Sequence, residues 1–203
     1  MIVIGLTGGV GMGKSTTTKL FAEEGVPVWD ADAAVHRLYQ PGGDAVLPVV
    51  EAFPGTGSKG AGIDRAALGE AVLGDAKALQ KLESIVHPMV RTDRLRFIKD
   101  CAARGEKLVI CDIPLLLEGE GRDMFDTLVV VSAPEEVRRE RVMARSGMTE
   151  EKYAAIVGRQ MPDAEKRALA DYIIMTDSGV DSARSQVRAI IAELLGTSQI
   201  EPE

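Results

Sequence analysis

Four residues near the start of the chain have the types and the spacing that phosphate chemistry requires. They form the pattern G-x-x-x-x-G-K-S, which combines a glycine-rich turn with one ammonium group and one hydroxyl: Gly8, Gly13, Lys14 and Ser15. Backbone amides that all face one anion need a chain without Cβ atoms where it curls, and this stretch supplies glycine four times between positions 8 and 13. The pattern therefore predicts that the chain binds a nucleoside triphosphate.

Each part of this stretch is expected to make a different contact. Lys14 is a compact cation that reaches the β- and γ-phosphates, and the hydroxyl of Ser15 is a ligand for Mg²⁺. A helix that begins at Lys14 adds the partial positive charge of its N-terminus. The residues expected to surround the phosphates are Gly8, Gly9, Val10, Gly11, Met12, Gly13, Lys14, Ser15 and Thr16.

The elements around the loop must place it at the edge of a sheet. An apolar run at 2–6 predicts a buried strand, and residues 14–24 predict a helix that stops before Gly25. Similar apolar runs alternate with helical segments along the rest of the chain, at 26–29, 107–112, 127–131 and 172–175. This order predicts an α/β fold with a five-stranded parallel sheet flanked by helices. Ligands of such a sheet bind beyond the carboxyl ends of its strands.

The segment between the second and third strands is too long for a simple crossover. Its apolar residues follow a helical period over about 70 residues, which predicts a helical insert between the second and third strands. Within the insert, His87-Pro88 is expected to break a helix, and the glycine-rich stretch at 54–62 is expected to be an exposed loop. The length of the chain predicts one compact unit.

The bulk composition excludes several classes of function. The net charge is −7 over 203 residues, so no basic excess is present for general binding of nucleic acid or an anionic membrane. No apolar run approaches the ~18 residues of a membrane span, and the first apolar run is too short for a signal peptide. Cys101 and Cys111 are the only cysteines, which predicts reduced thiols in a cytoplasmic protein.

Elimination among phosphate-loop proteins leaves a kinase for a small molecule. A GTP-binding switch needs the patterns Asn-Lys-x-Asp and Asp-x-x-Gly, whereas this chain has no asparagine and no Asp-x-x-Gly. A motor or transporter ATPase is normally longer and carries an arginine finger or a signature loop, neither of which we identify. A kinase also needs a carboxylate beside the acceptor hydroxyl and cations around the transferred group.

Candidates for these roles follow the second, third and fourth expected strands. Asp32 would accept the hydroxyl proton, or alternatively cap the next helix. Arg141 and Arg145 share a helix face with Arg138, and they either cover the phosphates or belong to a solvated face with i, i+4 ion pairs. Asp112 is either an outer-shell partner of the metal or a strand-end cap.

With these residues in place, the chain resembles the dephospho-CoA kinase family over nearly its whole length. Beyond the loop, the matching residues are Asp30-Ala31-Asp32, Arg65 with Leu68, His87-Pro88, Pro114-Leu115-Leu116 with Glu118, Arg141 with Arg145, Gln160, and Ala170-Asp171. The loop is shared by many kinases, but this ordered set is far more selective. The resemblance implies an enzyme that uses ATP to phosphorylate the ribose 3′-hydroxyl of dephospho-CoA, the last step of coenzyme A synthesis.

The resemblance also implies an organisation and a set of roles. It implies a nucleotide-binding core at 1–32, 106–134 and 166–203, an acceptor-binding helical insert at 33–105 and a helical lid at 135–165. It makes Asp32 the general base, and places Arg141 as a catalytic group and Arg145 as a nucleotide contact in the lid. The residues implied at the acceptor site are Asp32, Arg65, His87, Pro114, Leu115, Leu116 and Glu118.

Some alternatives stay open at this point. His87 would otherwise be a helix-stop residue and Arg65 a solvated charge. The family often has an asparagine near a glycine after the fifth strand, where this chain has Thr176-Asp177-Ser178-Gly179, so no adenine contact is assigned. The rival functions are a kinase for another small hydroxyl acceptor, of the nucleoside monophosphate or shikimate type, and an ATP-binding regulatory protein. The expected assembly is a monomer or a weak homo-oligomer.

Overall fold

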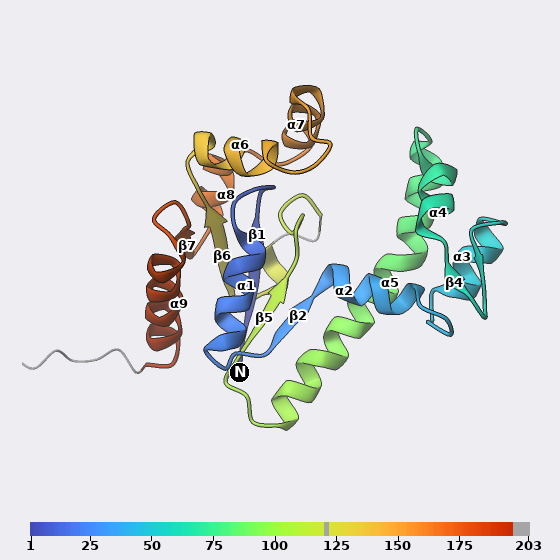
Figure 1. Cartoon of the computed structure of the whole chain (residues 1–203). Coiled ribbons are helices and arrows are strands. Elements are labelled where there is room, and N and C mark those ends of the chain that lie inside the picture. Colours follow the sequence, from blue (N-terminus) through green and yellow to red (C-terminus); the bar gives the residue numbers. More distant parts are fainter. Residues whose placement is uncertain (120–121, 197–203) are drawn as a thin grey trace, which may run out of the picture. The chain divides into compact units, whose positions relative to one another are not determined.

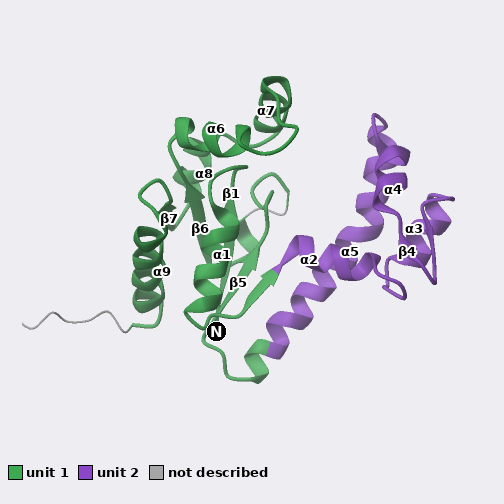
Figure 2. Cartoon of the chain, in the orientation of Figure 1, with its two compact units in different colours: residues 1–29, 101–203 green, residues 30–100 purple. Residues whose placement is uncertain are grey.

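The computed structural model describes residues 1–119 and 122–196 (Figure 1). They form two compact units, one of Met1–Trp29 with Cys101–Glu203 and one of Asp30–Asp100 (Figure 2). The second unit begins three residues before the expected insert and ends five residues before its expected end. The sequence prediction of a single compact unit differs from this division.

A five-stranded sheet forms the centre of the first unit, with the strand order β2-β5-β1-β6-β7. Its strands are β1 (Ile2–Gly8), β2 (Val28–Asp30), β5 (Leu108–Asp112), β6 (Thr127–Ser132) and β7 (Tyr172–Met175). The central strand β1 pairs in parallel with both neighbours, so that Ile4 lies opposite Ile110 on one side and Thr127 on the other. The predicted parallel α/β fold is confirmed.

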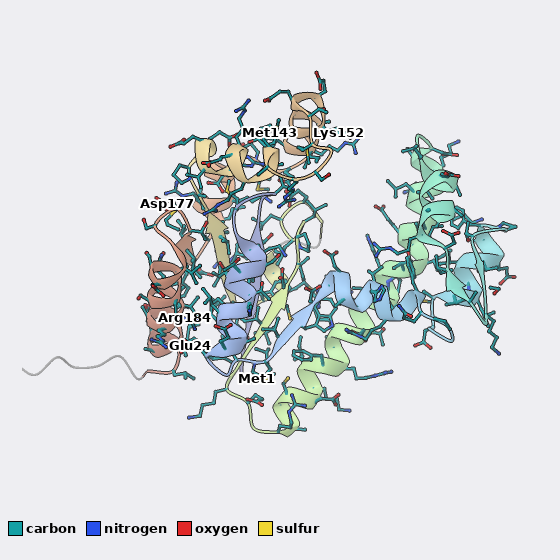
Figure 3. The ribbon with its side chains drawn as sticks, viewed as in Figure 1. Met1, Glu24, Met143, Lys152, Asp177 and Arg184 are labelled. Carbon is teal, nitrogen blue, oxygen red and sulfur yellow. The ribbon has the colours of Figure 1, made fainter. Side chains whose placement is uncertain are left out.

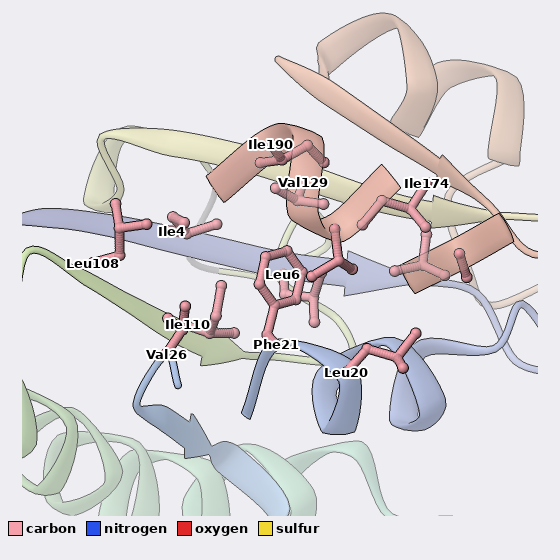
Figure 4. Close-up of a cluster of buried hydrophobic side chains, with 13 residues drawn as sticks. Ile4, Leu6, Leu20, Phe21, Val26, Leu108, Ile110, Val129, Ile174 and Ile190 are labelled. Atoms are coloured by element: carbon pink, nitrogen blue, oxygen red, sulfur yellow. The ribbon is translucent and has the colours of Figure 1, made fainter. Parts of the chain in front are cut away.

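Helices cover the sheet because its strands are mostly apolar and would otherwise expose that surface to water. The helices of this unit are α1 (Lys14–Glu23), α6 (Glu135–Met143), α7 (Glu150–Val157), α8 (Asp163–Leu169), α9 (Val180–Leu194) and the short turn η1 (Arg122–Met124). In β6, Val129 and Val131 join Phe21 of α1 and Ile190 of α9 in one cluster (Figure 4). Leu128 and Val130 of β6 belong to a separate cluster on the other face of the sheet, because successive side chains on a strand point to opposite faces.

A charged cluster fastens α9 to the end of α1, where Arg184 and Glu24 lie next to each other (Figure 3). Arg184 donates to Glu23 Oε2 at 2.6 Å and to Glu24 Oε1 at 3.1 Å. Arg188 adds a second ion pair to Glu24, with 3.0 Å between Nε and Oε2. The bond from Arg184 lowers the pKa of Glu23, and bonds from Arg188 and then Arg184 lower the pKa of Glu24.

We expect Arg184→Met to lower the melting temperature by about 1–4 °C at pH 7 and by less in acid. Since both glutamate pKa values are lower in the folded chain than in the unfolded one, the pairs add stability above the unfolded value of 4.5. That contribution to stability is lost as the pH falls through the lowered pKa values that Glu23 and Glu24 have in the folded chain. Thermal unfolding of the wild type, Arg184→Met and the exposed control Arg159→Met at pH 7, 5, 4 and 3 tests this. A difference that stays constant down to pH 3 would contradict it.

The second unit is helical, with a small hairpin. Its elements are α2 (Ala31–Tyr39), α3 (Val46–Ala52), β3 (Gly57–Ser58), β4 (Gly62–Ile63), α4 (Arg65–Val72) and most of α5 (Ala76–Ala103). Its core contains Leu38, Val49, Phe53 and Val86. Within residues 1–119 and 122–196, we find no helix with the length and apolar character to cross a membrane.

The expected break at His87-Pro88 is wrong, because α5 continues through Pro88 as one helix of 28 residues. Proline inside a helix costs about 3 kcal/mol, since it removes one backbone hydrogen bond. Here the apolar positions Leu82, Val86 and Met89 keep their helical spacing across the proline and pack on the core of the unit. Burial along this face therefore outweighs the local cost.

The exposed loop expected at 54–62 is also partly wrong. Gly57 pairs with Ile63 and Ser58 with Gly62 in a short antiparallel hairpin. Gly62 has a φ of 79°, and a Cβ there would lie 2.5 Å from the carbonyl oxygen of Tyr39. Glycine thus allows the hairpin to approach the end of α2, a contact that sequence composition does not show.

Candidate active site

The phosphate loop connects β1 to α1, as the sequence predicts. Gly13 precedes the helix with a φ of 92°, and no side chain caps it. Thr17 N–H donates to Gly13 O, but within the described part of the chain no acceptor meets the amides of Lys14, Ser15 and Thr16. Three amides at a helix N-terminus suit an anionic ligand, because they carry the positive end of the helix dipole.

The loop glycines are also required by the elements that surround them. A Cβ on Gly8 would lie 2.7 Å from the carbonyl oxygen of Val131 in β6. On Gly11 it would lie 2.5 Å from a methyl of Val142 in α6, and Gly11 also has a φ of 77°. A side chain at Gly8 or Gly11 would therefore displace the loop through contacts within the protein, whether or not a phosphate is bound.

Arg138 and Gln160 hold the first half of the loop. Val10 N–H donates to Gln160 Oε1 at 3.0 Å, and Val10 O accepts from Arg138 Nε at 3.2 Å. Arg138 Nη2 also donates to Gln160 Oε1 at 3.3 Å. The backbone N–H and C=O of Val10 are thus both bonded by side chains from the expected lid.

Arg141 and Thr176 hold the second half of the loop. Thr176 Oγ1 donates to Met12 O at 2.8 Å. Arg141 donates to Thr176 Oγ1 at 2.8 Å, to Thr176 O at 2.6 Å and to Gly11 O at 3.4 Å. The guanidinium of Arg141 therefore lies between the loop and the end of β7, whereas Arg145 follows α6 with an exposed side chain.

Lys14 is fixed by a carboxylate at the end of β5. Its Nζ donates to Asp112 Oδ1, and Asp112 Oδ2 accepts from Thr18 Oγ1 at 2.6 Å. The Asp112 side chain is 3% exposed, so the ammonium group offsets a buried negative charge. Asp112 therefore does more than cap a strand, because it orients the lysine of the loop.

The turn after β5 is tied to the core and to the segment that follows α7. Pro114 O accepts from Thr7 Oγ1 at 3.1 Å, and Leu116 is fully buried. Glu118 pairs with the buried Lys166 at 2.7 Å and accepts from Met161 N–H at 2.9 Å. Among the apolar residues of this turn that are predicted to contact the acceptor substrate, Leu115 is the most exposed, at 49%.

The remaining predicted residues belong to the second unit. Asp30 caps α2 by accepting from Ala33 N–H at 2.8 Å, while Asp32 lies exposed in the first turn of that helix. The alternative of Asp32 as the N-cap is therefore wrong. Burial raises the pKa of Tyr39, and the positive charge of Arg65, the first residue of α4, partly offsets that rise. His87 lies exposed in the middle of α5.

The sequence and the fold agree with one family of known proteins. A sequence model of the family described as Dephospho-CoA kinase matches residues 2–182. This chain belongs to the dephospho-CoA kinase family. A dephospho-CoA kinase of Mesorhizobium japonicum is 57% identical over 97% of this chain and 98% of its own length. One of Rhodopseudomonas palustris is 51% identical over 94% of each chain.

Solved structures agree with this membership. The crystal structure of TT1252 from Thermus thermophilus has a TM-score of 0.79 and 36% identity, over 95% of this chain and 97% of its own. The dephospho-CoA kinase of Campylobacter jejuni has a TM-score of 0.66 and 25% identity, over 95% and 96%. The predicted fold, kinase activity and place at the final step of coenzyme A synthesis are confirmed, and the family implies the use of ATP.

Sequence reasoning missed several residues that hold the phosphate loop or the turn after β5 in place. Arg138 lay on the predicted helix face of Arg141 and Arg145, so a signal was present, but no role was assigned to it. Met12 contributes its side chain as well as its backbone, because that side chain is buried and its sulfur accepts from Ala133 N–H at 3.2 Å. Lys166 gave no local signal, since a buried lysine is recognised only from its partner, Glu118.

Proposed function

We propose that phosphoryl transfer occurs at the β1–α1 loop, with Lys14 on the β- and γ-phosphates of ATP and Asp32 as the base. The ribose 3′-oxygen of dephospho-CoA forms a bond to the γ-phosphorus while the bond from that phosphorus to the β,γ-bridging oxygen breaks. ADP leaves, and the hydroxyl proton passes to the Asp32 carboxylate. The observation that carries this proposal is the loop itself. Among the described residues, the amides of Lys14, Ser15 and Thr16 meet no protein acceptor, and the ammonium group of Lys14 is fixed by Asp112.

Mg²⁺ fits the donors at the loop. No cluster of three or more His, Cys, Asp or Glu side chains that could hold a metal occurs in the described residues, and Mg²⁺ usually takes one or two protein ligands together with water and phosphate oxygens. The Ser15 hydroxyl, on the first turn of α1, would bind it, with Asp112 nearby as an outer-shell group. The ion would neutralise charge on the β- and γ-phosphates.

Arg141 and Arg145 would supply the other positive charges. In the structure, Arg141 uses two of its three nitrogens to bind Thr176 and the loop. Its charge therefore lies against the loop that receives the phosphates. Arg145 is exposed after α6 and would contact the nucleotide from the lid at 135–165, which excludes water from the transferred group.

The acceptor would bind with the help of the helical insert, through Arg65 and His87, and of Pro114, Leu115, Leu116 and Glu118. The insert contains a pocket of about 190 Å³ that combines apolar and polar groups: Leu38, Asp44, Pro88, Met89, Thr92, Asp93 and Arg96. This volume is smaller than a typical ligand site of about 300–1,000 Å³, so it fits only part of an acceptor. We propose that part of the acceptor contacts this pocket, whose lining includes Pro88, the residue after His87.

The remaining proposals concern the cellular location and the oligomeric state of the protein. The chain's two cysteines, Cys101 and Cys111, are both buried and neither is in a disulfide, as expected in a reducing compartment. This supports a cytoplasmic location. We propose a monomer or weak homo-oligomer, which light scattering after size-exclusion chromatography would measure.

The expected acceptor specificity is testable with one panel. ADP release should be stimulated by dephospho-CoA, and it should stay near the background rate with AMP, CMP, shikimate or no acceptor. Mass spectrometry of the product should show one added phosphate on the ribose. Equal stimulation by another acceptor would overturn the substrate assignment, and ADP release that ignores every acceptor would overturn the transfer reaction.

A further inference from the structure

The backbone N–H and C=O of Val10 are part of a closed ring of hydrogen bonds. Gln160 Oε1 accepts from Val10 N–H at 3.0 Å and from Arg138 Nη2 at 3.3 Å, while Arg138 Nε donates to Val10 O at 3.2 Å. Each of the three residues is therefore bonded to the other two. We call this set the Val10 clasp.

The clasp is held in place from the side of α6. The Arg138 side chain is 7% exposed, and its Nη1 pairs with Glu135 Oε2 at 3.2 Å. Its guanidinium also lies 5.9 Å from the centre of the Tyr153 ring, and the Tyr153 hydroxyl donates to the other oxygen of Glu135. Burial and the bond to Glu135 raise the pKa of Tyr153, so its hydroxyl stays protonated and donates to Glu135. Arg138 is thus oriented by residues of both α6 and α7.

The clasp joins segments that are far apart in the sequence. Gln160 follows α7 and is 150 residues from Val10, and Arg138 is 128 residues from it. The fit is close, since a Cβ on Gly9 would lie 3.2 Å from Gln160 Oε1 and 3.5 Å from Arg138 Nη2. The position of the loop therefore depends on the position of both lid helices.

We propose that Arg138 and Gln160 are positioning residues for phosphoryl transfer, which set the Val10 peptide and so couple the lid helices to the phosphate loop. This inference rests on the proposed function of the loop. Neither residue needs to touch the substrate. Their bonds fix the backbone of Val10 in the first half of the loop, whereas Arg141 and Thr176 hold the second half. The amides at the start of α1 and the ammonium group of Lys14 have other supports, the helix and Asp112.

Loss of the clasp should therefore change alignment more than affinity. A nucleotide would still bind through α1 and Lys14, so KM for ATP should change little. The γ-phosphoryl group, however, would sit in a loop whose first half is free to reorient, and a misplaced reacting group lowers the rate of transfer. Water would then compete better with the acceptor for the same phosphorus.

The test compares Gln160→Met, which keeps the length of the side chain but removes the acceptor oxygen, with Gln160→Glu, which keeps such an oxygen and can pair with Arg138. We expect Gln160→Met to lower kcat by about 10–100-fold, the loss of one charge-assisted hydrogen bond network, with KM for ATP within about threefold. Gln160→Glu should recover kcat to within about threefold of the wild type. The control Glu165→Met makes a similar change on the exposed side of α8 and should leave kcat unchanged.

A second readout separates alignment from general damage. With dephospho-CoA present, the ratio of ATP hydrolysed to ATP transferred should rise in Gln160→Met, whereas a smaller folded fraction would lower both reactions equally. The inference is overturned if that ratio stays at the wild-type value, if KM rises while kcat is unchanged, or if Gln160→Glu is no better than Gln160→Met.

Arg138→Lys gives an independent test if Gln160→Met does not fold, as judged by thermal unfolding. Lysine keeps the charge but has a single nitrogen, so it cannot reproduce the separate bonds that Nε and Nη2 of Arg138 make to Val10 O and Gln160 Oε1. It should raise the same hydrolysis ratio, and the double variant should be no worse than the more affected single one, because both remove one clasp. Additive losses would overturn the coupling. An inactive wild type would instead overturn the proposed function.

Discussion

Lys14→Ala is expected to lower phosphoryl transfer by about a thousandfold or more, which makes it the largest single effect. The ammonium group offsets charge on the β- and γ-phosphates, and no other lysine lies in the loop. Initial rates of coenzyme A formation at saturating ATP and dephospho-CoA measure the loss. Lys19→Ala, at an exposed position of the same helix, is the matched control and should keep the wild-type rate.

The same substitution also removes the partner of Asp112. Because that carboxylate is buried, its unpaired charge should lower the melting temperature as well. Thermal unfolding of Lys14→Ala must therefore accompany the kinetics, and Lys14→Met, which keeps the packing of the stem, gives a second variant. Substantial transfer by a folded Lys14 variant would contradict the role of the loop.

Asp32→Asn is expected to cut turnover by about a hundredfold or more while the affinity for ATP stays nearly intact. Asparagine has almost the same shape but cannot accept the hydroxyl proton. The measurements are kcat for dephospho-CoA and the dissociation constant of ATP from calorimetry.

Asp30→Asn provides the matched control for this prediction, because it makes the same change two residues earlier. Asp30 caps α2, and asparagine caps a helix about as well as aspartate does. Turnover should therefore be preserved in Asp30→Asn. If Asp32→Asn turned over at a near-normal rate, or if the two variants lost the same activity, Asp32 would not be the base.

Local patterns predicted a large part of the fold. The phosphate loop, the strand before it and the helix after it were all expected, because their residues depend mainly on neighbours within a few positions. The apolar runs of β5 and β6 likewise predicted strands that are buried on both faces of the sheet. The errors occurred where distant packing outweighs a local rule, as at Pro88, which lies inside α5 because its neighbours bury an apolar face.

The candidate site residues likewise divide into those that local spacing identifies and those that only the fold brings together. Lys14 and Ser15 were identified by their spacing alone, and the structure places both at the loop. Arg138 and Gln160 could not be connected from the sequence, since 22 residues separate them and only the fold brings both to Val10. The role of Asp112 was left between two alternatives until its bond to Lys14 showed that it orients the loop lysine.

The sequence by itself determined that this chain has a phosphate loop on a parallel α/β sheet, because glycine, lysine and serine at fixed spacing act through local backbone geometry. The tertiary structure alone decided what holds that loop in position. Hydrogen bonds from Arg138, Gln160, Arg141 and Thr176 reach it from segments more than a hundred residues away. Such bonds depend on how helices and strands pack, and no short pattern in the chain encodes that packing.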